Sequence, residues 1–214
     1  MGAIQASQHR HGMPGSPIQS VEDHIERLVD LPLLMLKREG RNEVGVGRFS
    51  EHLNTLDATE QALAFSDFLH HEHYVWHSAR PRSAHATLEL RAACQQPPRE
   101  HMAAAALGVA MVQAAPQLAQ LVAERLGSDP WAVMRSWHPA VIDEGLAVTE
   151  PVPGLLADVL SCCYAALRAR GRGEQRFLDP LGARLDARIN PAQASHAAFE
   201  AGGLHALLDA VRCT

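Results

Sequence analysis

The feature that most constrains the fold of this sequence is a short alternating stretch, Thr87-Leu88-Glu89-Leu90-Arg91. Side chains along a strand point alternately to its two faces, so Thr87, Glu89 and Arg91 share one face, opposite Leu88 and Leu90. An acid and a guanidinium two residues apart suit a site that holds a metal ion beside a carboxylate or phosphate. The pattern also suits a solvated strand face with an ordinary cross-strand ion pair.

The neighbouring segments predict a second strand and a long helix. Tyr74-Val75-Trp76 is aromatic and β-branched, which favours a strand, and a basic turn over 79–82 follows it with Arg80 and Arg82. Arginine presents paired planar donors that match carboxylate or phosphate oxygens. Prolines at 97 and 98 end the second strand, and an Ala-rich helix is expected over 100–113.

Ahead of these strands the sequence predicts an irregular arm, then helices and one buried strand. Residues 1–19 are rich in Gly, Pro, Ser, His and Gln, and Ser20 with Asp23 approximates a capping box that starts a helix. Leu33-Leu34-Met35-Leu36 fits a buried strand, and a charged turn is expected over 37–47. Because a lone strand must pair, a partner outside this polypeptide is one expectation. Helices are expected over 49–53 and 57–68.

Composition excludes several classes of protein. The 214 residues carry 20% charged and 47% apolar residues with a net charge of −5, which is typical of a globular protein and argues against nucleic acid as a partner. No apolar segment reaches the length of a membrane span, and residues 1–15 contain no apolar signal region. Cys94, Cys162, Cys163 and Cys213 match neither a zinc spacing nor a disulfide framework, so reduced thiols in the cytoplasm are expected.

The C-terminal half predicts helices. Pro116 is expected to divide a helix over 103–126, Asp129 and Pro130 start the next, and an amphipathic helix is expected over 154–170. Further helices open at Asp179-Pro180 and Asn190-Pro191, with a break at Gly202-Gly203. The cluster His70-His71-Glu72-His73 suggests one possible function, a metal-dependent hydrolase, although nothing matches the HExxH arrangement.

The segment from Ala79 to Arg91, ARPRSAHATLELR, followed by a proline turn and a small-residue helix, resembles the carboxylate–amine ligase family, which includes glutamate–cysteine ligases. Members show an Arg-Pro, a short gap and then a Thr/Leu-Glu-x-Arg strand. The Glu-x-Arg strand also resembles glutamine synthetase, which shares the fold superfamily. The resemblance extends to Asp30–Met35, Phe49–Leu53 and the closing helices over 174–211.

The resemblance implies ATP-dependent formation of a γ-glutamyl amide bond. The γ-carboxylate of glutamate attacks the γ-phosphate of ATP, and an amine such as cysteine displaces phosphate from the acyl phosphate. ATP and Mg²⁺ are the implied cofactors. By position in the motif, Glu89 would bind magnesium and Arg91 would bind the substrate carboxylate or the transferring phosphoryl group. Arg80 would contact the nucleotide phosphates or the substrate, which gives it both a catalytic and a cofactor-binding role.

The sequence also departs from the family pattern. No acid follows Arg91 in Ala92-Ala93-Cys94-Gln95, and the family's first half, with most of its acidic metal ligands, has no counterpart. The resemblance therefore covers only the C-terminal portion of such an enzyme. Two hypotheses follow: a ligase seen in part, or a non-catalytic remnant or subunit whose partner carries the N-terminal half. A homo-oligomer is a further expectation.

The expected fold is α+β, an antiparallel sheet fragment of the glutamine synthetase-like fold packed with a mostly helical C-terminal half. The predicted divisions are an irregular arm over 1–19, a partial catalytic domain over 20–126 and a helical region of the same domain over 127–214. No membrane and no nucleic-acid partner is expected.

Overall fold

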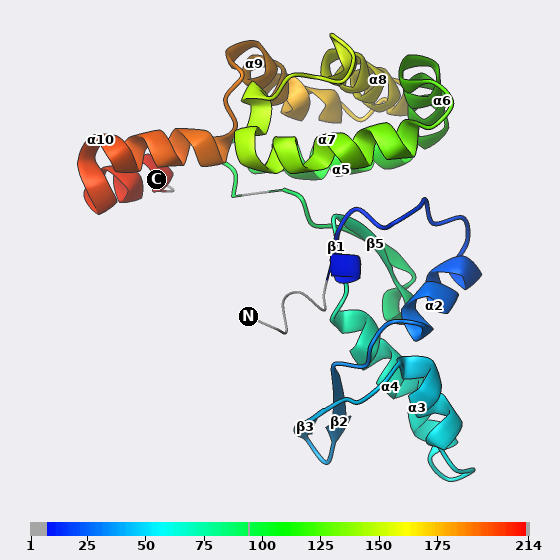
Figure 1. Cartoon of the computed structure of the whole chain (residues 1–214). Coiled ribbons are helices and arrows are strands. Elements are labelled where there is room, and N and C mark those ends of the chain that lie inside the picture. Colours follow the sequence, from blue (N-terminus) through cyan, green and yellow to red (C-terminus); the bar gives the residue numbers. More distant parts are fainter. Residues whose placement is uncertain (1–7, 94, 213–214) are drawn as a thin grey trace. The chain divides into compact units, whose positions relative to one another are not determined.

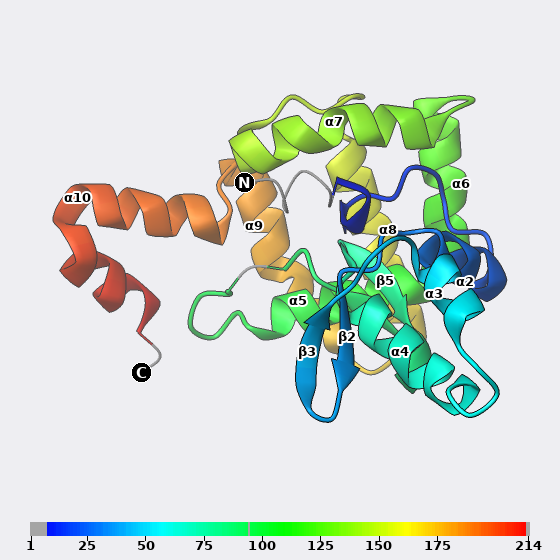
Figure 2. The same cartoon turned by 60° about the horizontal axis from the view of Figure 1, so that its bottom comes forward.

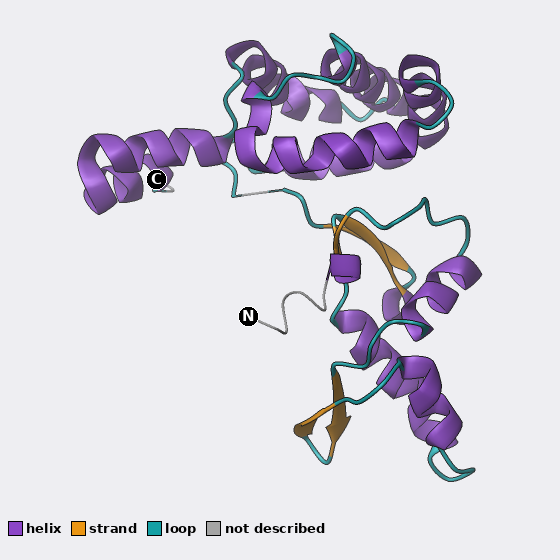
Figure 3. Ribbon diagram, viewed as in Figure 1, coloured by secondary structure: helices purple, strands orange, loops and turns teal. Residues whose placement is uncertain are grey.

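The computed structural model describes residues 8–93 and 95–212 (Figure 1). The protein is α+β with about 63% helix, and its described sheets have two strands each (Figure 3). The predicted α+β class is thus confirmed at this coarse level. The chain divides into two compact units, Met1–Ala92 and Ala93–Thr214, so the helices expected over 100–126 belong with the C-terminal helices.

The first unit combines short strands with short helices. Its described elements are, in order, the 3₁₀ turn η1 (Gln8–Arg10), β1 (His11–Gly12), α2 (Val21–Val29), β2 (Met35–Arg38), β3 (Arg41–Val44), α3 (Phe49–Thr55), α4 (Gln61–His73), β4 (Trp76–His77), β5 (Ala79–Arg82), the 3₁₀ turn η2 (Ser83–His85) and β6 (Thr87–Leu90).

The core of this unit lies where α2, α3 and α4 meet. Leu28, Phe49 and Phe68 are buried there together with Val75. The His71 ring stacks on Phe49 with ring centroids 4.6 Å apart, and its Nε2 lies 2.8 Å from the Leu28 carbonyl oxygen. One histidine of the cluster is therefore a core residue.

The β2–β3 hairpin corrects two sequence predictions. The segment expected as a charged turn over 37–47 contains β3, and the apolar run pairs with it, with Leu36 opposite Glu43, and not with a strand from another polypeptide. Glu39 and Gly40 form the turn with φ values of 49° and 79°, which suit a two-residue hairpin. All of β3 is exposed, so no apolar pattern marked it as a strand.

A buried ion cluster ties this hairpin to α4. Asp67 is 2% exposed and accepts hydrogen bonds from both terminal nitrogens of Arg38, at 2.6 and 2.7 Å. His52 Nε2 lies 2.9 Å from the same carboxylate. Burial alone would raise the pKa of Asp67, but Arg38 and His52 outweigh burial and lower it.

Part of the predicted arm is docked on the unit. Residues 1–7 lie outside the described residues, but β1 pairs in parallel with β4, and Arg10 is fully buried. Its guanidinium donates to the carbonyl of Tyr74 at 3.2 Å and to that of Pro32. No helix or strand forms over 13–19, as expected for an irregular segment.

The strands near the predicted site are shifted from their expected positions. Tyr74 caps the C-terminus of α4, so the strand expected over 74–76 begins at Trp76. The segment expected as a basic turn over 79–82 is itself the strand β5. The turn lies further on, where Ala86 adopts a left-handed conformation with φ 48°.

The second unit is helical throughout its regular structure. Its described elements are α5 (Met102–Gln113), α6 (Ala115–Leu126), α7 (Pro130–Glu144), η3 (Gly145–Ala147), α8 (Leu155–Arg170), η4 (Glu174–Leu178), α9 (Asp179–Ala187) and α10 (Pro191–Val211). Figure 2 shows these helices from a second side. The core lies between α5, α8 and η4, from buried Ala110, Cys163, Leu167 and Leu178.

Helix boundaries in this unit follow the sequence signals. Pro116 lies in the first turn of α6, and α5 and α6 are bent by 81° to one another. Asp129 caps α7 by accepting from the Ala132 amide at 3.0 Å. Asn190 and Gln193 form a capping box for α10, which kinks at Gly202 and Gly203. These predictions are confirmed because caps and prolines act locally.

Among residues 8–93 and 95–212, no single helix has the length and apolar composition of a membrane span; the bent pair α5 and α6 meets these criteria only together.

Candidate functional site: an arginine cluster on the β5–β6 hairpin

The hairpin of β5 and β6 brings the predicted site residues together. Its register places Arg80 opposite Glu89 and Arg82 opposite Thr87. The Arg91 amide donates to the Ser78 carbonyl, so residues 78 and 91 form a hydrogen-bonded pair of the ladder. Hydrogen-bonded and non-hydrogen-bonded pairs alternate along antiparallel strands, and Pro81 lies in a non-hydrogen-bonded pair with its nitrogen directed away from β6. A proline that cannot donate is tolerated there, which explains how a strand runs through the Arg-Pro motif.

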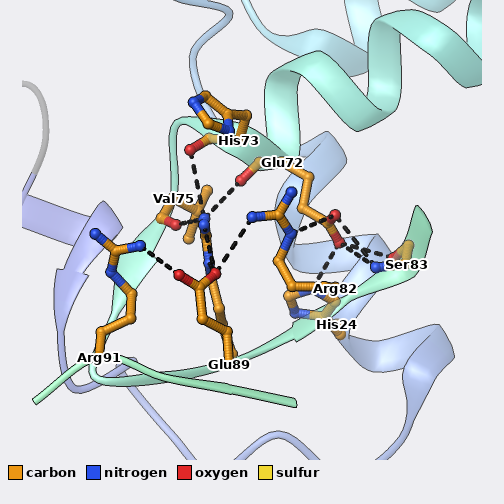
Figure 4. Close-up of polar contacts among 9 residues, drawn as sticks. His24, Glu72, His73, Val75, Arg82, Ser83, Glu89 and Arg91 are labelled. Carbon is orange, nitrogen blue, oxygen red and sulfur yellow. Dashed lines mark hydrogen bonds and ion pairs between the residues drawn. The ribbon is translucent and has the colours of Figure 1, made fainter. Parts of the chain in front are cut away.

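Three guanidinium groups surround the Glu89 carboxylate (Figure 4). Arg80 Nε and Nη2 lie 2.9 and 2.8 Å from Glu89 Oε2, and Arg82 Nη1 lies 3.2 Å from the same oxygen. Arg91 Nη1 donates to Oε1 at 2.6 Å. Hydrogen bonds from Arg80, and then those from Arg82 and Arg91, lower the pKa of Glu89 to about 2.

Arg80 differs from the other two arginines because it is buried. Its side chain is 1% exposed, and Nη1 donates to the carbonyl oxygens of Glu72 at 3.0 Å, His73 at 3.4 Å and Val75. These carbonyls lie at and just beyond the C-terminal end of α4, where main-chain oxygens lack helical partners. Arg80 therefore caps α4 while it holds Glu89.

A second carboxylate, Glu72, lies behind the cluster in the last turn of α4. It is fully buried and accepts from the Ser83 hydroxyl at 2.7 Å and from the Ser83 amide at 3.1 Å. His24 Nε2 lies 3.5 Å away on one side and Arg82 Nε 3.7 Å away on the other. Burial would raise the pKa of Glu72, but the contacts with His24 and Ser83 outweigh it and lower the pKa.

The structure confirms that Glu89 and Arg91 share one face of the strand, opposite Leu88 and Leu90. Arg80 lies on the same face as Glu89 and Arg91, and of the three only Arg80 is buried and reaches the end of α4. On the other face Leu88 is 52% exposed and Leu90 is 42% exposed. Alternation fixes which residues share a face but not which face is covered.

Three further residues of this cluster were missed or given no role from the sequence: Glu72, His24 and Arg82. A signal existed for two of them. His24 lies four residues before buried Leu28, and Glu72 lies four residues after buried Phe68, so each shares a helix face with a core residue. A charged residue on a core face of a helix requires a partner, and that requirement marks it as a candidate.

The histidine cluster does not converge on one point. His71 is in the core, His73 is exposed, and burial lowers the pKa of His70, whose ring packs edge-on against Tyr74. Within the described parts of the chain, no group of three or more His, Cys, Asp or Glu is placed to hold a metal ion.

The arrangement around Glu89 does not fit a magnesium ion. Magnesium is usually held in proteins by one or two carboxylates. Both Glu89 oxygens already accept hydrogen bonds from guanidinium groups, and a divalent cation there would stand among three positive charges. The metal role of Glu89 stays a prediction that requires the arginines to move.

The buried cysteine of α8, Cys163, is not a reactive centre. Cys162 and Cys163 are unpaired residues of α8, and burial raises the pKa of the Cys163 thiol to about 11. A thiol with a raised pKa is a poor nucleophile, because the thiolate is the reactive form. Cys94 and Cys213 lie outside the described residues.

The chain matches no protein-family model, and no curated protein matches it. The geometry of the arginine cluster is therefore the basis for a functional proposal.

Proposed function

We propose that the chain is part of an ATP-dependent ligase of the glutamate–cysteine type, with the glutamine synthetase-like fold, and that it binds the substrate carboxylate through Arg91. One observation carries the proposal: three arginines of one hairpin converge on a single carboxylate, Glu89. Paired guanidinium groups are suited to binding carboxylate and phosphoryl oxygens.

The charges of the cluster support an anionic ligand. Arg80, Arg82 and Arg91 are balanced by only two carboxylates, Glu72 and Glu89, so an excess of positive charge remains. The Arg91 side chain is 36% exposed, which makes its remaining donors accessible from solvent. In a ligase this excess would offset the repulsion between a carboxylate and the triphosphate that it attacks.

The ligase also requires acidic groups that the described residues do not supply together. We propose that a second polypeptide, carrying the N-terminal half of the enzyme, brings the carboxylates that accompany ATP and magnesium. The exposed apolar face of the hairpin, with Leu88 and Leu90, supports such a partner, because an apolar sheet face of this kind is normally covered. We place the assembly in the cytoplasm.

The second candidate function is binding without turnover, as a remnant or regulatory subunit. It is favoured by the burial of Arg80, which directs one predicted catalytic group into the protein interior. ATP consumption separates the two functions. Turnover of ATP with glutamate and cysteine, by the chain alone or mixed with a candidate N-terminal half, supports the ligase, and turnover by the chain alone excludes the remnant.

Calorimetry with glutamate tests the role of Arg91. Arg91→Ala should abolish glutamate binding and leave the fold intact. Arg170→Ala is a matched control, because Arg170 is 30% exposed and pairs with Glu174 at 3.1 Å in the other unit, as Arg91 pairs with Glu89 at 2.6 Å. Absence of glutamate and ATP binding, with no turnover in any mixture, would overturn the proposed function.

A further inference from the structure

Glu89 occupies the position that an anionic ligand would take in this cluster. Oε2 accepts from Arg80 at 2.9 Å and from Arg82 at 3.2 Å, and Oε1 accepts from Arg91 at 2.6 Å. A bound carboxylate or phosphate in an arginine site makes the same kinds of contact. The chain therefore already carries an anion at its own arginine site.

The three arginines are not equally committed to Glu89. Arg80 is fixed, because its donors are divided between Glu89 and three main-chain carbonyls. Arg82 donates to Glu89 from Nη1 at 3.2 Å, and its Nε lies 3.7 Å from Glu72 Oε2, beyond hydrogen-bond distance.

Glu89 is the more exposed of the two carboxylates in the cluster. Its side chain is 32% exposed and has three rotatable bonds, whereas the other carboxylate, Glu72, is fully buried and held by Ser83. Glu72 contacts Arg82 from the protein interior, and Glu89 contacts it from the side that is open to solvent. The two carboxylates thus have different mobilities and different roles.

We propose that Glu89 is an internal counter-anion, which a ligand carboxylate or phosphoryl group displaces from Arg82 and Arg91 while Arg80 stays fixed. The identity of the ligand as glutamate rests on the proposed function, but the displacement does not. Glu89 then lowers the affinity of the site for anions and neutralises part of the arginine charge in the unliganded protein. This role is opposite to that of a magnesium ligand, and the two roles predict changes of opposite sign.

The test measures anion binding by Glu89→Gln without any metal ion, using inorganic phosphate and L-glutamate as separate probes. Glutamine is nearly isosteric and keeps one oxygen for Arg80, but it removes the competing charge. We expect the affinity for at least one probe to rise by roughly tenfold, because one partly screened charge at contact distance is lost. Glu174→Gln, which neutralises the 29% exposed partner of Arg170, should change neither affinity.

A double variant and the NMR signal of the Glu89 carboxyl group test whether the gain in affinity comes from the arginine cluster. Adding Arg91→Ala to Glu89→Gln should remove the gain. In the wild-type chain, saturation with the better-bound probe should shift the side-chain carboxyl ¹³C resonance of Glu89, whereas Mg²⁺ alone should not. If Glu89→Gln fails to fold, the wild-type measurement decides: no shift with either probe, or a shift with Mg²⁺, overturns the proposal.

The outcomes separate this inference from the proposed function. If Glu89→Gln gains affinity for phosphate and the wild-type chain shows neither glutamate binding nor turnover in any mixture, the counter-anion stands and the ligase is excluded. If the wild-type chain binds glutamate and Glu89→Gln binds both probes less tightly or unchanged, the counter-anion is overturned and the ligase stands.

Discussion

Arg80 and Glu89 face each other across the β5–β6 hairpin with Nη2 2.8 Å from Oε2, yet the Arg80 side chain is 1% exposed and that of Glu89 is 32% exposed. One member of the pair belongs to the interior and the other to the surface. The consequences of mutation should therefore differ between the arginines that share this carboxylate.

Arg80→Ala should destabilise the first unit by about 2–5 kcal/mol, because it removes a buried guanidinium that donates to carbonyls at the end of α4 and to Glu89. Arg91→Ala should cost less than about 1 kcal/mol, as expected for an exposed ion pair. Urea unfolding followed by amide NMR signals of β5 and α4 measures both. Equal losses for the two variants would show that Arg80 does not cap α4.

The structural features that could be predicted from the sequence are those that depend on residues close together in the chain. Caps at Ser20, Asp129 and Asn190 were predictable because each depends on atoms within three residues. The shared face of Glu89 and Arg91 likewise followed from alternation along one strand. These features need no knowledge of distant contacts.

The remaining features depend on what lies across the fold. The burial of Arg80 depends on the end of α4, where carbonyl oxygens accept from its guanidinium. The strand β3 has no buried residue and is specified by the turn at Glu39 and Gly40. Burial of Arg10 requires the carbonyls of Pro32 and Tyr74, more than 20 residues away. A pattern in one segment cannot reveal such partners.

Asp67→Asn should loosen the β2–β3 hairpin from α4. The carboxylate is 2% exposed and holds Arg38 and His52, so the amide leaves the Arg38 guanidinium without its counter-charge. The expected loss is about 3 kcal/mol, the order found when one partner of a buried ion pair is removed. Amide hydrogen exchange should accelerate more in β2 than in α2. Asp23→Asn is the control, because Asp23 pairs with Arg27 at the surface of α2 and its loss should cost much less than the loss of Asp67.

Gly45→Ala should destabilise the first unit because a Cβ at this position would lie 2.5 Å from both the carbonyl oxygen and the Cγ of Leu33. The backbone at Gly45 or at Leu33 must then shift, at a cost of about 1–3 kcal/mol. Gly182→Ala in α9 meets nothing within 4 Å and should stabilise its helix by up to about 1 kcal/mol. Thermal unfolding of both variants checks the pair. The melting temperature should fall in Gly45→Ala and rise in Gly182→Ala. An unchanged melting temperature in Gly45→Ala would contradict the close approach of Leu33.

The first unit should lose stability as the pH falls from about 6.5 to about 4, because burial lowers the pKa of His71 to about 4 from its usual 6.5. Between these values the unfolded chain binds a proton that folded His71 does not, so stability rises with pH through this window and is fully present above it. A shift of this size corresponds to about 3 kcal/mol. His77, whose pKa burial also lowers, acts in the same direction.

His71→Phe isolates the contribution of His71. Phenylalanine keeps a ring against Phe49, and the Leu28 carbonyl retains the Leu31 amide at 3.1 Å, so the fold should persist at pH 7. Urea unfolding measured from pH 7 to pH 4 should show a much smaller loss in this variant than in the wild type. His196→Phe, at a side chain that is 76% exposed, should leave the wild-type loss unchanged. If both variants lose as much stability as the wild type, another group controls the acid sensitivity of the first unit.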